Sequence, residues 1–355
     1  MRKRILVGIA GIFYYSGLVA LARWLTQRAG PRVVILNYHS ATGGSFLQHM
    51  RYLRRHYRIM HVEAALEELY AQRKDPAYKS KKRTPLVITL DDGYRDNFTY
   101  AKEIAHDLCT PISIYLIPDY IESGARFWWL EGKSMARRAQ VEEVTLTDRT
   151  FHLKNPEERG ALAQYIDDRA RFATSVAERE EFLASTRALL NLSATPHEKD
   201  RDDAMLPVNW EQVKVMDEGG WVSFGAHTMH HPILSYLTDP AEVRQEVAEC
   251  RQVLEQKLGH PIRTFAYPVG QAQHIGSDVV QAVRDAGYNW ALTTTYGINT
   301  PQTDPILLKR IEADVDQHWL VVAAEAAGLW GFISRLRWLP LIRKNFTNAS
   351  RQKGM

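Results

Sequence analysis

The stretch LVITLDDGYRDN, residues 86–97, decides the fold. A short apolar and β-branched run ends directly in two carboxylates, Asp91 and Asp92, and Gly93 follows them. An apolar run of this length, bounded by turn residues, predicts a buried strand with both acids at its carboxyl end. Adjacent carboxylates repel each other and lose solvation there, and a bound cation removes that cost. A plain strand–turn–helix with capping acids is the alternative.

Six further segments predict strands, and helical segments separate them. The strands are expected at residues 33–38, 112–117, 221–226, 263–267, 290–295 and 306–313. The clearest helix covers residues 238–261. Thr238 or Asp239 caps its first turn, and Gly259 ends it. Strands and helices that alternate in this number favour an α/β fold with a parallel sheet, either open or closed into a (β/α) barrel.

Residues 124–206 interrupt this alternation. They are charged and mostly helical in character, with no convincing strand, so we predict a helical insertion into a domain that spans residues 32–316. The insertion opens with Phe127, Trp128 and Trp129. This aromatic cluster either forms the core of the insertion or, beside a cleft, stacks on a sugar ring.

The N-terminal segment, residues 1–31, indicates contact with a membrane. Three basic residues precede 18 uncharged ones, from Ile5 to Ala22. This length is near the lower limit for a spanning helix, and the flanking charge would place the rest of the chain outside the cytoplasm. Tyr14 and Tyr15 fall in mid-span, and Ala20-Leu21-Ala22 is similar to a cleavage site. A spanning anchor, a cleaved signal peptide and a membrane-surface helix therefore all remain open.

The C-terminal segment, residues 317–355, is predicted to be basic and amphipathic. It contains no acid after Glu325 and is rich in Trp and Arg, which indicates either a membrane surface or a solubilising tail. The formal net charge of the whole chain is only +4, which does not suggest nucleic acid as a partner. The two cysteines, Cys109 and Cys250, have no metal-ligand spacing.

The stretch SFGAHTMHHPILS, residues 223–235, carries the second chemical signal. His227 and His231 follow a predicted strand, and Pro232 biases His231 toward an extended conformation. Both histidines are therefore expected on a loop rather than on one face of a helix. Two histidines and one acid make a three-ligand site with open positions for water, which is the arrangement that catalytic zinc needs.

Two more strand ends carry polar groups. In RTFAYPVG, residues 263–270, a strand runs into a Pro-Gly turn that can present backbone N–H groups to an anion. In VVILNYH, residues 33–39, the strand ends at His39, which alone could be a packing residue or a chemical one. All these polar residues lie at carboxyl ends of separate predicted strands. In a β/α barrel those ends meet on one face, where active sites form, so their convergence favours function.

At these residues the sequence resembles the polysaccharide deacetylases, the NodB-homology or carbohydrate esterase family 4 group. The first family motif, T-F-D-D-G, is matched by residues 89–93, and the second, H-[ST]-x-x-H with one added residue, by residues 227–231. The resemblance covers roughly residues 32–315 and implies a distorted (β/α) barrel that removes acetyl groups from sugars. It implies Asp91 as the catalytic base, and one divalent metal, zinc first, on the following ligands: Asp92, His227 and His231.

The third family motif is altered. The family has an arginine shortly before the proline of this motif, which orients the catalytic base. Here Ala266 and Tyr267 precede Pro268, so that orienting role is unassigned. The candidates for it are Arg263 and Arg310.

The general acid also departs from the usual family pattern. The last motif, L-x-H, supplies it, whereas Leu308-Lys309-Arg310 offers no histidine. A subgroup that includes bacterial poly-N-acetylglucosamine deacetylases carries this histidine on a Y-H after an N-terminal apolar strand, which Tyr38-His39 resembles. The leaving nitrogen must gain a proton, so we expect His39 to be the acid. The oxyanion and substrate are expected at the turn of Tyr267, Pro268 and Val269, on the Val269 backbone N–H.

The sequence thus predicts a membrane-associated, metal-dependent hydrolase that removes acetyl groups from an N-acetylated (GlcNAc-type) glycan, with its catalytic domain outside the cytoplasm in a bacterial cell envelope. Two alternatives stay open. One is a related amide hydrolase that acts on a small non-sugar substrate. The other is a glycan-binding barrel without catalysis, which the altered third motif suggests.

Overall fold

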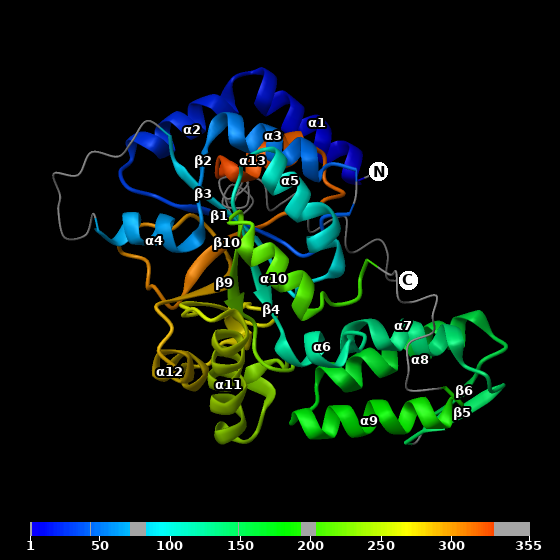
Figure 1. Ribbon diagram of the computed structural model, residues 1–355. Coiled ribbons are helices and arrows are strands. Elements are labelled where there is room, and N and C mark those ends of the chain that lie inside the picture. Colours follow the sequence, from blue (N-terminus) through cyan, green and yellow to red (C-terminus); the bar gives the residue numbers. More distant parts are fainter. Residues whose placement is uncertain (1, 43, 72–82, 148, 193–203, 330–355) are drawn as a thin grey trace.

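The computed structural model describes residues 2–42, 44–71, 83–147, 149–192 and 204–329 (Figure 1). Seven parallel strands close into a barrel in the order β1-β10-β9-β8-β7-β4-β3, and β3 pairs again with β1. Their bounds are β1 Val34–Tyr38, β3 Pro85–Leu90, β4 Ile112–Leu116, β7 Val222–Ala226, β8 Thr264–Ala266, β9 Trp290–Tyr296 and β10 Leu308–Glu312. A two-residue strand, β2 (Arg58–Ile59), pairs with the start of β3. The prediction of a (β/α) barrel is confirmed, and each of the seven predicted strands is present.

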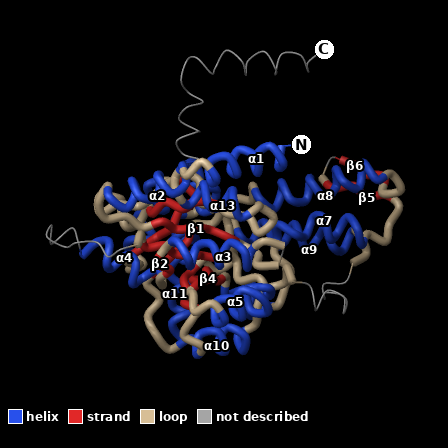
Figure 2. Tube along the Cα trace, turned by 90° about the horizontal axis from the view of Figure 1, so that it is seen from above, coloured by secondary structure: helices blue, strands red, loops and turns tan. Residues whose placement is uncertain are grey.

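Side chains of the barrel strands alternate between the lumen and the outer helices. Ile35, Val87 and Leu292 belong to a lumen cluster that α4 (Val62–Ala71) also contacts. Leu36 and its outward neighbours on the other strands belong to the larger cluster under the outer helices. The helices in this outer layer are α3 Phe46–His56, α5 Lys102–Asp107, α10 Trp210–Glu218, α11 Pro240–Leu258, α12 Ser277–Asp285 and α13 Trp319–Ala326. Figure 2 labels all of them except α12, which Figure 1 labels. The lumen is thus a packed core, as the barrel geometry requires.

The predicted helix at residues 238–261 is α11, and its ends follow the expected signals. The Asp239 side chain accepts a hydrogen bond from the Ala241 backbone N–H (2.8 Å), and Pro240 occupies the first turn. Gly259 ends the helix with φ 76°, a left-handed conformation that favours glycine.

The insertion forms a separate lobe at the carboxyl end of β4. It follows the short helix α6 (Pro118–Ser123), and its elements are α7 Trp128–Arg138, β5 Glu143–Leu146, β6 Arg149–His152, α8 Pro156–Arg171 and α9 Val176–Leu189 (Figure 1). The expectation of no strand was wrong, because β5 and β6 form an antiparallel hairpin. Each strand has four residues and buries only alternate side chains, namely Val144, Leu146 and Phe151. A hairpin this short has too little apolar sequence to be recognised against its charged surroundings.

The N-terminal apolar segment is two helices rather than one. α1 (Arg2–Tyr15) and α2 (Leu18–Arg28) meet at Gly17, which has φ 81°, and their axes differ by 67°. Within the described residues, no single helix has both the length and the apolar character needed to cross a membrane, and only this bent pair reaches them together. The inner side of α1 packs on α13 through Ala10, Leu320 and Val321.

The C-terminal segment divides at the end of α13. All described side chains of Leu320–Ala326 are buried, so this helix is part of the folded body although the sequence placed it in the tail. Residues 330–355, where most of the predicted basic amphipathic segment falls, lie outside the described residues.

Candidate active site

Asp91 and Asp92 leave the barrel directly beyond β3. β1 and β3 pair in register from Val34 with Leu86 to Tyr38 with Leu90, and the Asp91 backbone N–H continues this ladder to the Tyr38 carbonyl (2.9 Å). The chain then turns sharply, with φ 75° at Asp92 and 69° at Gly93. A Cβ on Gly93 would lie 2.7 Å from a methyl group of Leu116, so this turn has room only for glycine.

Arg310 reaches through the barrel lumen to Asp91. Its guanidinium forms a two-pronged ion pair, with Nη1 2.7 Å from Oδ1 and Nη2 2.8 Å from Oδ2. The same group donates to the Asn37 amide oxygen (2.7 Å) and to the Thr293 carbonyl (2.9 Å). Both Arg310 and Asp91 are almost completely buried. Burial alone would raise the pKa of Asp91, but the Arg310 charge, followed by His227, holds that pKa well below its usual range.

Arg263, the other candidate for orienting the base, lies elsewhere. It precedes β8 at the amino end of the barrel, and its exposed guanidinium is 3.3 Å from a carboxylate oxygen of Glu63. It does not reach Asp91. The residue that supports Asp91 thus comes from β10 at the far end of the chain, not from the third motif.

Asp92, His227 and His231 form the one group within the described residues that meets the geometric requirement for a metal site. Asp92 Oδ1 lies 3.4 Å from His227 Nε2 and 3.6 Å from His231 Nε2. Tetrahedral ligand atoms bonded at about 2.0–2.1 Å to a zinc ion are themselves about 3.3–3.4 Å apart. The three residues therefore fit a divalent ion with little rearrangement.

The surroundings of the two histidines prepare them as ligands. His227 Nδ1 bonds the Ala266 carbonyl (2.7 Å), which leaves Nε2 facing Asp92. His231 has no such bond: its Nδ1 is buried without a partner among the described residues, and its ring packs 4.4 Å from that of Trp129. Burial, followed by the neighbouring His227, lowers the pKa of His231 to about 3, so its imidazole is neutral.

The charge of His227 follows from its acidic neighbours. Burial alone would lower its pKa, but the hydrogen bond with Asp92 and the charges of Asp91 and Asp92 raise it. Metal ligation requires a neutral imidazole, so a proton and a metal ion compete for His227.

His39 lies on the rim of the same cavity. Its side chain is exposed and makes no hydrogen bond within the described part of the chain, so its backbone alone fixes its place. Asp96 holds that backbone: its buried carboxylate accepts from the Ser40 hydroxyl and from the next two backbone N–H groups (both 2.8 Å). The Asn97 amide donates to the His39 carbonyl (3.1 Å). The sequence reasoning assigned no site role to Asp96 or Asn97.

The turn after β8 has strained backbone. Val269 has φ 59°, which is rare for a β-branched residue, and its N–H donates no hydrogen bond to any described residue. Asp92 and His231 also have positive φ, so three residues with a strained backbone conformation lie at this site. Tyr267 lines the cavity wall, but its hydroxyl points away and bonds the Ile306 carbonyl (3.1 Å). Pro268 is buried behind it.

These residues surround an open cavity of about 360 Å³ at the carboxyl ends of the strands. Its lining residues are His39, Asp91, Asp92, Tyr94, Trp128, Trp129, Arg171, His227, His231, Tyr267, Val269 and Thr294. The site residues that the sequence predicted thus meet in one place, apart from Arg263 and the Pro268 ring. Arg171 was not predicted, because a basic residue at the end of a helix is ordinary in sequence.

The aromatic cluster of the insertion lies both in the core of the lobe and beside the cavity. Phe127 and Trp128 are buried in the core of the lobe, while Trp128 and Trp129 also form a wall of the cavity. The Trp128 indole N–H donates to the His231 carbonyl (3.0 Å), and that of Trp129 to the Tyr94 hydroxyl (2.8 Å). These two hydrogen bonds connect the lobe to the loop of His231 and to Tyr94.

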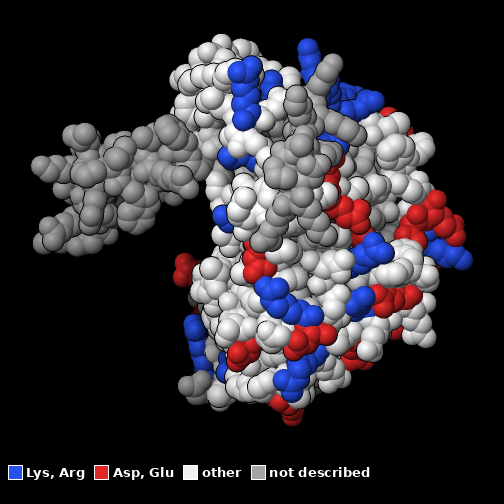
Figure 3. Space-filling model, turned by 90° about the vertical axis from the view of Figure 1, so that its left-hand side faces the viewer, with Lys and Arg blue, Asp and Glu red and all other residues white. Residues whose placement is uncertain are grey.

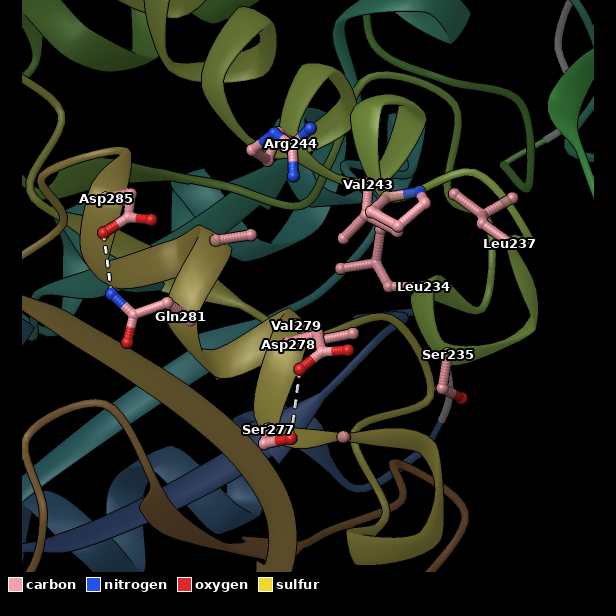
Figure 4. A pocket seen from close by; sticks show the side chains of 13 residues that line it. Leu234, Ser235, Leu237, Val243, Arg244, Ser277, Asp278, Val279, Gln281 and Asp285 are labelled. Atoms are coloured by element: carbon pink, nitrogen blue, oxygen red, sulfur yellow. Dashed lines mark hydrogen bonds between the residues drawn. The ribbon is translucent and has the colours of Figure 1, made fainter.

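A second cavity, of about 490 Å³, lies between α11 and α12 (Figure 4). Leu234, Val243 and Val279 line it together with Arg244 and Asp278. None of its lining residues is a histidine or a cysteine, and it contains no group of metal-ligand geometry. Among the described residues, the group with metal-ligand geometry therefore lies at the first cavity.

Solved structures of deacetylases share this fold. IcaB from Ammonifex degensii has 18% identity and a TM-score of 0.54, with 84% of this chain and 98% of that one aligned. Streptococcus pyogenes deacetylase PplD, solved with acetate, has 16% identity and a TM-score of 0.53, with 84% and 99% aligned. The BpsB deacetylase domain from Bordetella bronchiseptica has 14% identity and a TM-score of 0.51, with 80% and 96% aligned. No curated protein matches the chain by sequence.

The family assignment rests on the sequence itself. Residues 78–291 match the profile of the family described as polysaccharide deacetylase, and this is more than half of the chain. The matched region holds the Asp-Asp motif, the two histidines of the candidate metal site and the Pro-Gly turn, whereas His39 and Arg310 lie on either side of it. The chain belongs to the polysaccharide deacetylase family.

Proposed function

We propose that this protein hydrolyses the acetamido group of N-acetylated sugars in a glycan, and that the reaction depends on one divalent ion. The observation that carries the proposal is the joint placement of two units in one open cavity. One is the ionised Asp91, held by Arg310; the other is the group of Asp92, His227 and His231.

Asp92, His227 and His231 would hold the ion, with zinc the first candidate among divalent metals. A divalent ion in such a site polarises a carbonyl oxygen and makes a bound water more acidic. The protein's own contribution is to fix the three ligands before binding. Asp92 is locked by the turn at Gly93, and His227 by its bond to Ala266.

Asp91 acts as the base. Arg310 binds both carboxylate oxygens, which keeps Asp91 ionised and fixes its orientation toward the cavity. A carboxylate in this state takes a proton from the attacking water as the water adds to the acetyl carbon. The Val269 N–H, which no described residue uses, stabilises the negative oxygen that forms.

His39 acts as the general acid. The amine leaves only after its nitrogen gains a proton, because an amide anion is a very poor leaving group. His227 and His231 are committed as ligands, whereas the imidazole of His39 lies free on the cavity rim. Imidazole donates protons efficiently near neutral pH. This role agrees with the resemblance to the permuted subgroup, in which the acid comes from the first strand.

The cavity favours a sugar over a small non-sugar amide. Its opening is bordered by the half-buried Trp129 and by Arg171, which suit the flat face and the hydroxyl groups of a pyranose ring. The ionised Asp91 and the free Val269 N–H also argue against a barrel that only binds glycans.

Acetate release from N-acetylglucosamine oligomers tests the proposal. Purified protein is assayed as isolated, after treatment with a chelator, and after zinc is added back, with Asp91→Asn as the inactive control. Release that the chelator abolishes and zinc restores is the expected result. Binding of oligomers without release would support the binding barrel, and release only from small acetamides would support the non-sugar alternative.

We also propose that the enzyme works at a membrane surface outside the cytoplasm, in a bacterial cell envelope. The basic, apolar character of residues 1–31 supports this location. Full-length protein is expected in the membrane fraction of expressing cells, and a version without the first 30 residues should leave that fraction. A full-length protein found entirely in the soluble fraction would contradict this location.

A further inference from the structure

The helices α1, α2 and α3, which cover one side of the barrel, carry no acidic side chain. The first acidic residue of the sequence is Glu63, which follows all three helices. α13 packs against both α1 and α3, so these helices form one continuous side (Figure 1). In Figure 3, neutral and basic side chains occupy the upper part of the molecule, and acidic ones lie lower.

The outer face of α1 and α2 is apolar. Eight of the fifteen exposed large apolar side chains of the described residues lie on these helices or at the break between them. They are Ile5, Ile9, Ile12, Tyr15, Leu18, Leu21, Trp24 and Leu25. Ile5, Ile9 and Ile12 follow helical spacing on one face, and Ile12 is 67% exposed. A contiguous exposed apolar surface of this kind marks an interaction site.

A groove of about 290 Å³ lies beside this face, between α1 and α3. Aromatic rings form its walls: Tyr14 lies 4.9 Å from Trp319 and 6.1 Å from Tyr52, measured between ring centres. Arg51 and Arg55 line it from α3. Aromatic rings next to basic groups are typical of the polar boundary of a bilayer.

The positive charge of the groove has no counter-charge among the residues that the structure describes. Arg51 and Arg55 are four residues apart on one helix, where like charges repel, and neither forms an ion pair with a described residue. The neighbouring His56 responds to this field. Burial, followed by the charges of Arg23, Arg55 and Arg83, lowers its pKa to about 4. An anion from outside the protein would relieve this repulsion.

We infer that this side docks on an anionic lipid bilayer, with α1 and α2 lying in the membrane plane and a lipid phosphate in the groove of Arg51 and Arg55. The apolar outer face then enters the boundary between headgroups and acyl chains, as amphipathic surface helices do. This docking mode rests on the membrane association proposed above. It specifies which surface of the protein contacts the membrane and which lipid headgroups that surface binds.

Two observations favour a bilayer over other occupants. The bend of 67° and the packing of Ala10 on α13 fit helices that lie flat on the body of the protein. The chain's own residues 330–355 contain no acidic side chain, so they supply no carboxylate side chain for the arginines. A phospholipid surface provides both the phosphate and the apolar phase.

Vesicle co-sedimentation of the full-length protein tests the inference. Phosphatidylcholine vesicles are compared with vesicles that contain 30% phosphatidylglycerol, at about 0.15 M salt. The test variant is Arg51→Gln/Arg55→Gln, and Lys214→Gln/Arg244→Gln on α10 and α11 removes the same charge elsewhere. Because each basic residue at an anionic surface contributes about a fivefold gain in binding, the first variant should lose about 10- to 30-fold and the control far less. Ile12→Ser/Leu21→Ser, which alters only exposed positions, should weaken binding to anionic vesicles as well.

Two results would overturn the inference. Equal losses in the test and control variants would mean that net charge alone acts. The second result is a protein that does not bind vesicles but whose Tm rises with inorganic phosphate. If Arg51→Gln/Arg55→Gln removes that rise, the groove binds a soluble phosphate instead. Acetate release from soluble oligomers is measured in every variant. It should stay unchanged, which separates failure of the docking mode from failure of the proposed reaction.

Discussion

Replacing Arg310 by methionine is expected to damage both stability and pH dependence. Methionine has a similar length and fills the lumen, but it removes both bonds to Asp91 and the bonds to Asn37 and Thr293. Asp91 is then a buried charge without a partner. Breaking a buried pair in this way costs about 3–5 kcal/mol of unfolding free energy. In a protein of this size, that loss lowers Tm by about 4–7 °C.

The second part of this prediction concerns the base itself. Because Arg310 depresses the pKa of Asp91, the pair stabilises the fold above the unfolded-state pKa, and that stability is lost as pH falls through the folded-state pKa. Without Arg310, burial dominates and raises the pKa of Asp91. The acid limb of the kcat/KM profile for acetate release should then move to higher pH.

Calorimetry and pH–rate profiles of three variants check this reasoning. Arg263→Met is the matched control, because it removes an exposed ion pair worth at most about 1 kcal/mol. Asp91→Asn/Arg310→Met should recover part of the lost Tm, since no unpaired charge remains, but it should stay inactive. If the Tm of Arg310→Met stays within about 2 °C of the wild-type value and the acid limb does not move, Arg310 neither stabilises the fold nor lowers the pKa of Asp91.

The remaining predictions concern four other side chains. His39→Ala should lower amide turnover by about 10²–10⁴-fold with metal content unchanged, as measured by acetate release and elemental analysis, and near-normal turnover would remove it as the acid. His227→Ala should lose the roughly one equivalent of metal that the wild type binds; unchanged metal content would refute the ligand assignment. Asp96→Asn should slow amide hydrolysis but add little to the loss in His39→Ala, because Asp96 acts through the His39 loop; multiplied losses in the double variant would count against this. Burial, followed by Glu312, raises the pKa of Glu325 to about 8, so its contribution to stability is full below about pH 4.5 and falls toward pH 8. Glu325→Gln should therefore raise Tm at pH 8 and much less at pH 5, and equal shifts at both would refute the shifted pKa.

The barrel could be predicted from the sequence because its strands are nearly continuous apolar runs. Strands buried on both faces need such runs, and each run here ends in a turn or in polar residues. The hairpin β5–β6 could not be predicted, because half of each four-residue strand faces solvent. The bend between α1 and α2 was also missed. An isolated glycine such as Gly17 is tolerated within an apolar helix, so it does not by itself signal a break.

Site residues that lie close together in the sequence could be predicted from their spacing. The contact of Asp91 with Arg310 could not, because it forms across the barrel lumen. The paired acids and the two histidines can each be recognised from a few consecutive residues. The choice between Arg310 and Arg263 needed the three-dimensional path of β10, since nothing in the sequence says which arginine points inward. Asn37 did leave a signal, as a polar residue inside an apolar strand. In the structure it binds Arg310 at 2.7 Å.

The barrel closes where its first strand meets its last, and this has a consequence for biosynthesis. β1 lies between β3 and β10, and the partner of Asp91 is 219 residues further along the chain. At about 5–20 residues per second, a ribosome needs roughly 10–40 s to make that stretch. Once residue 231 has been added, the nascent chain has its paired acids and both histidines, but it still lacks Arg310, which holds Asp91 in place. The chain therefore gains its hydrolytic activity only when synthesis of the domain is nearly complete.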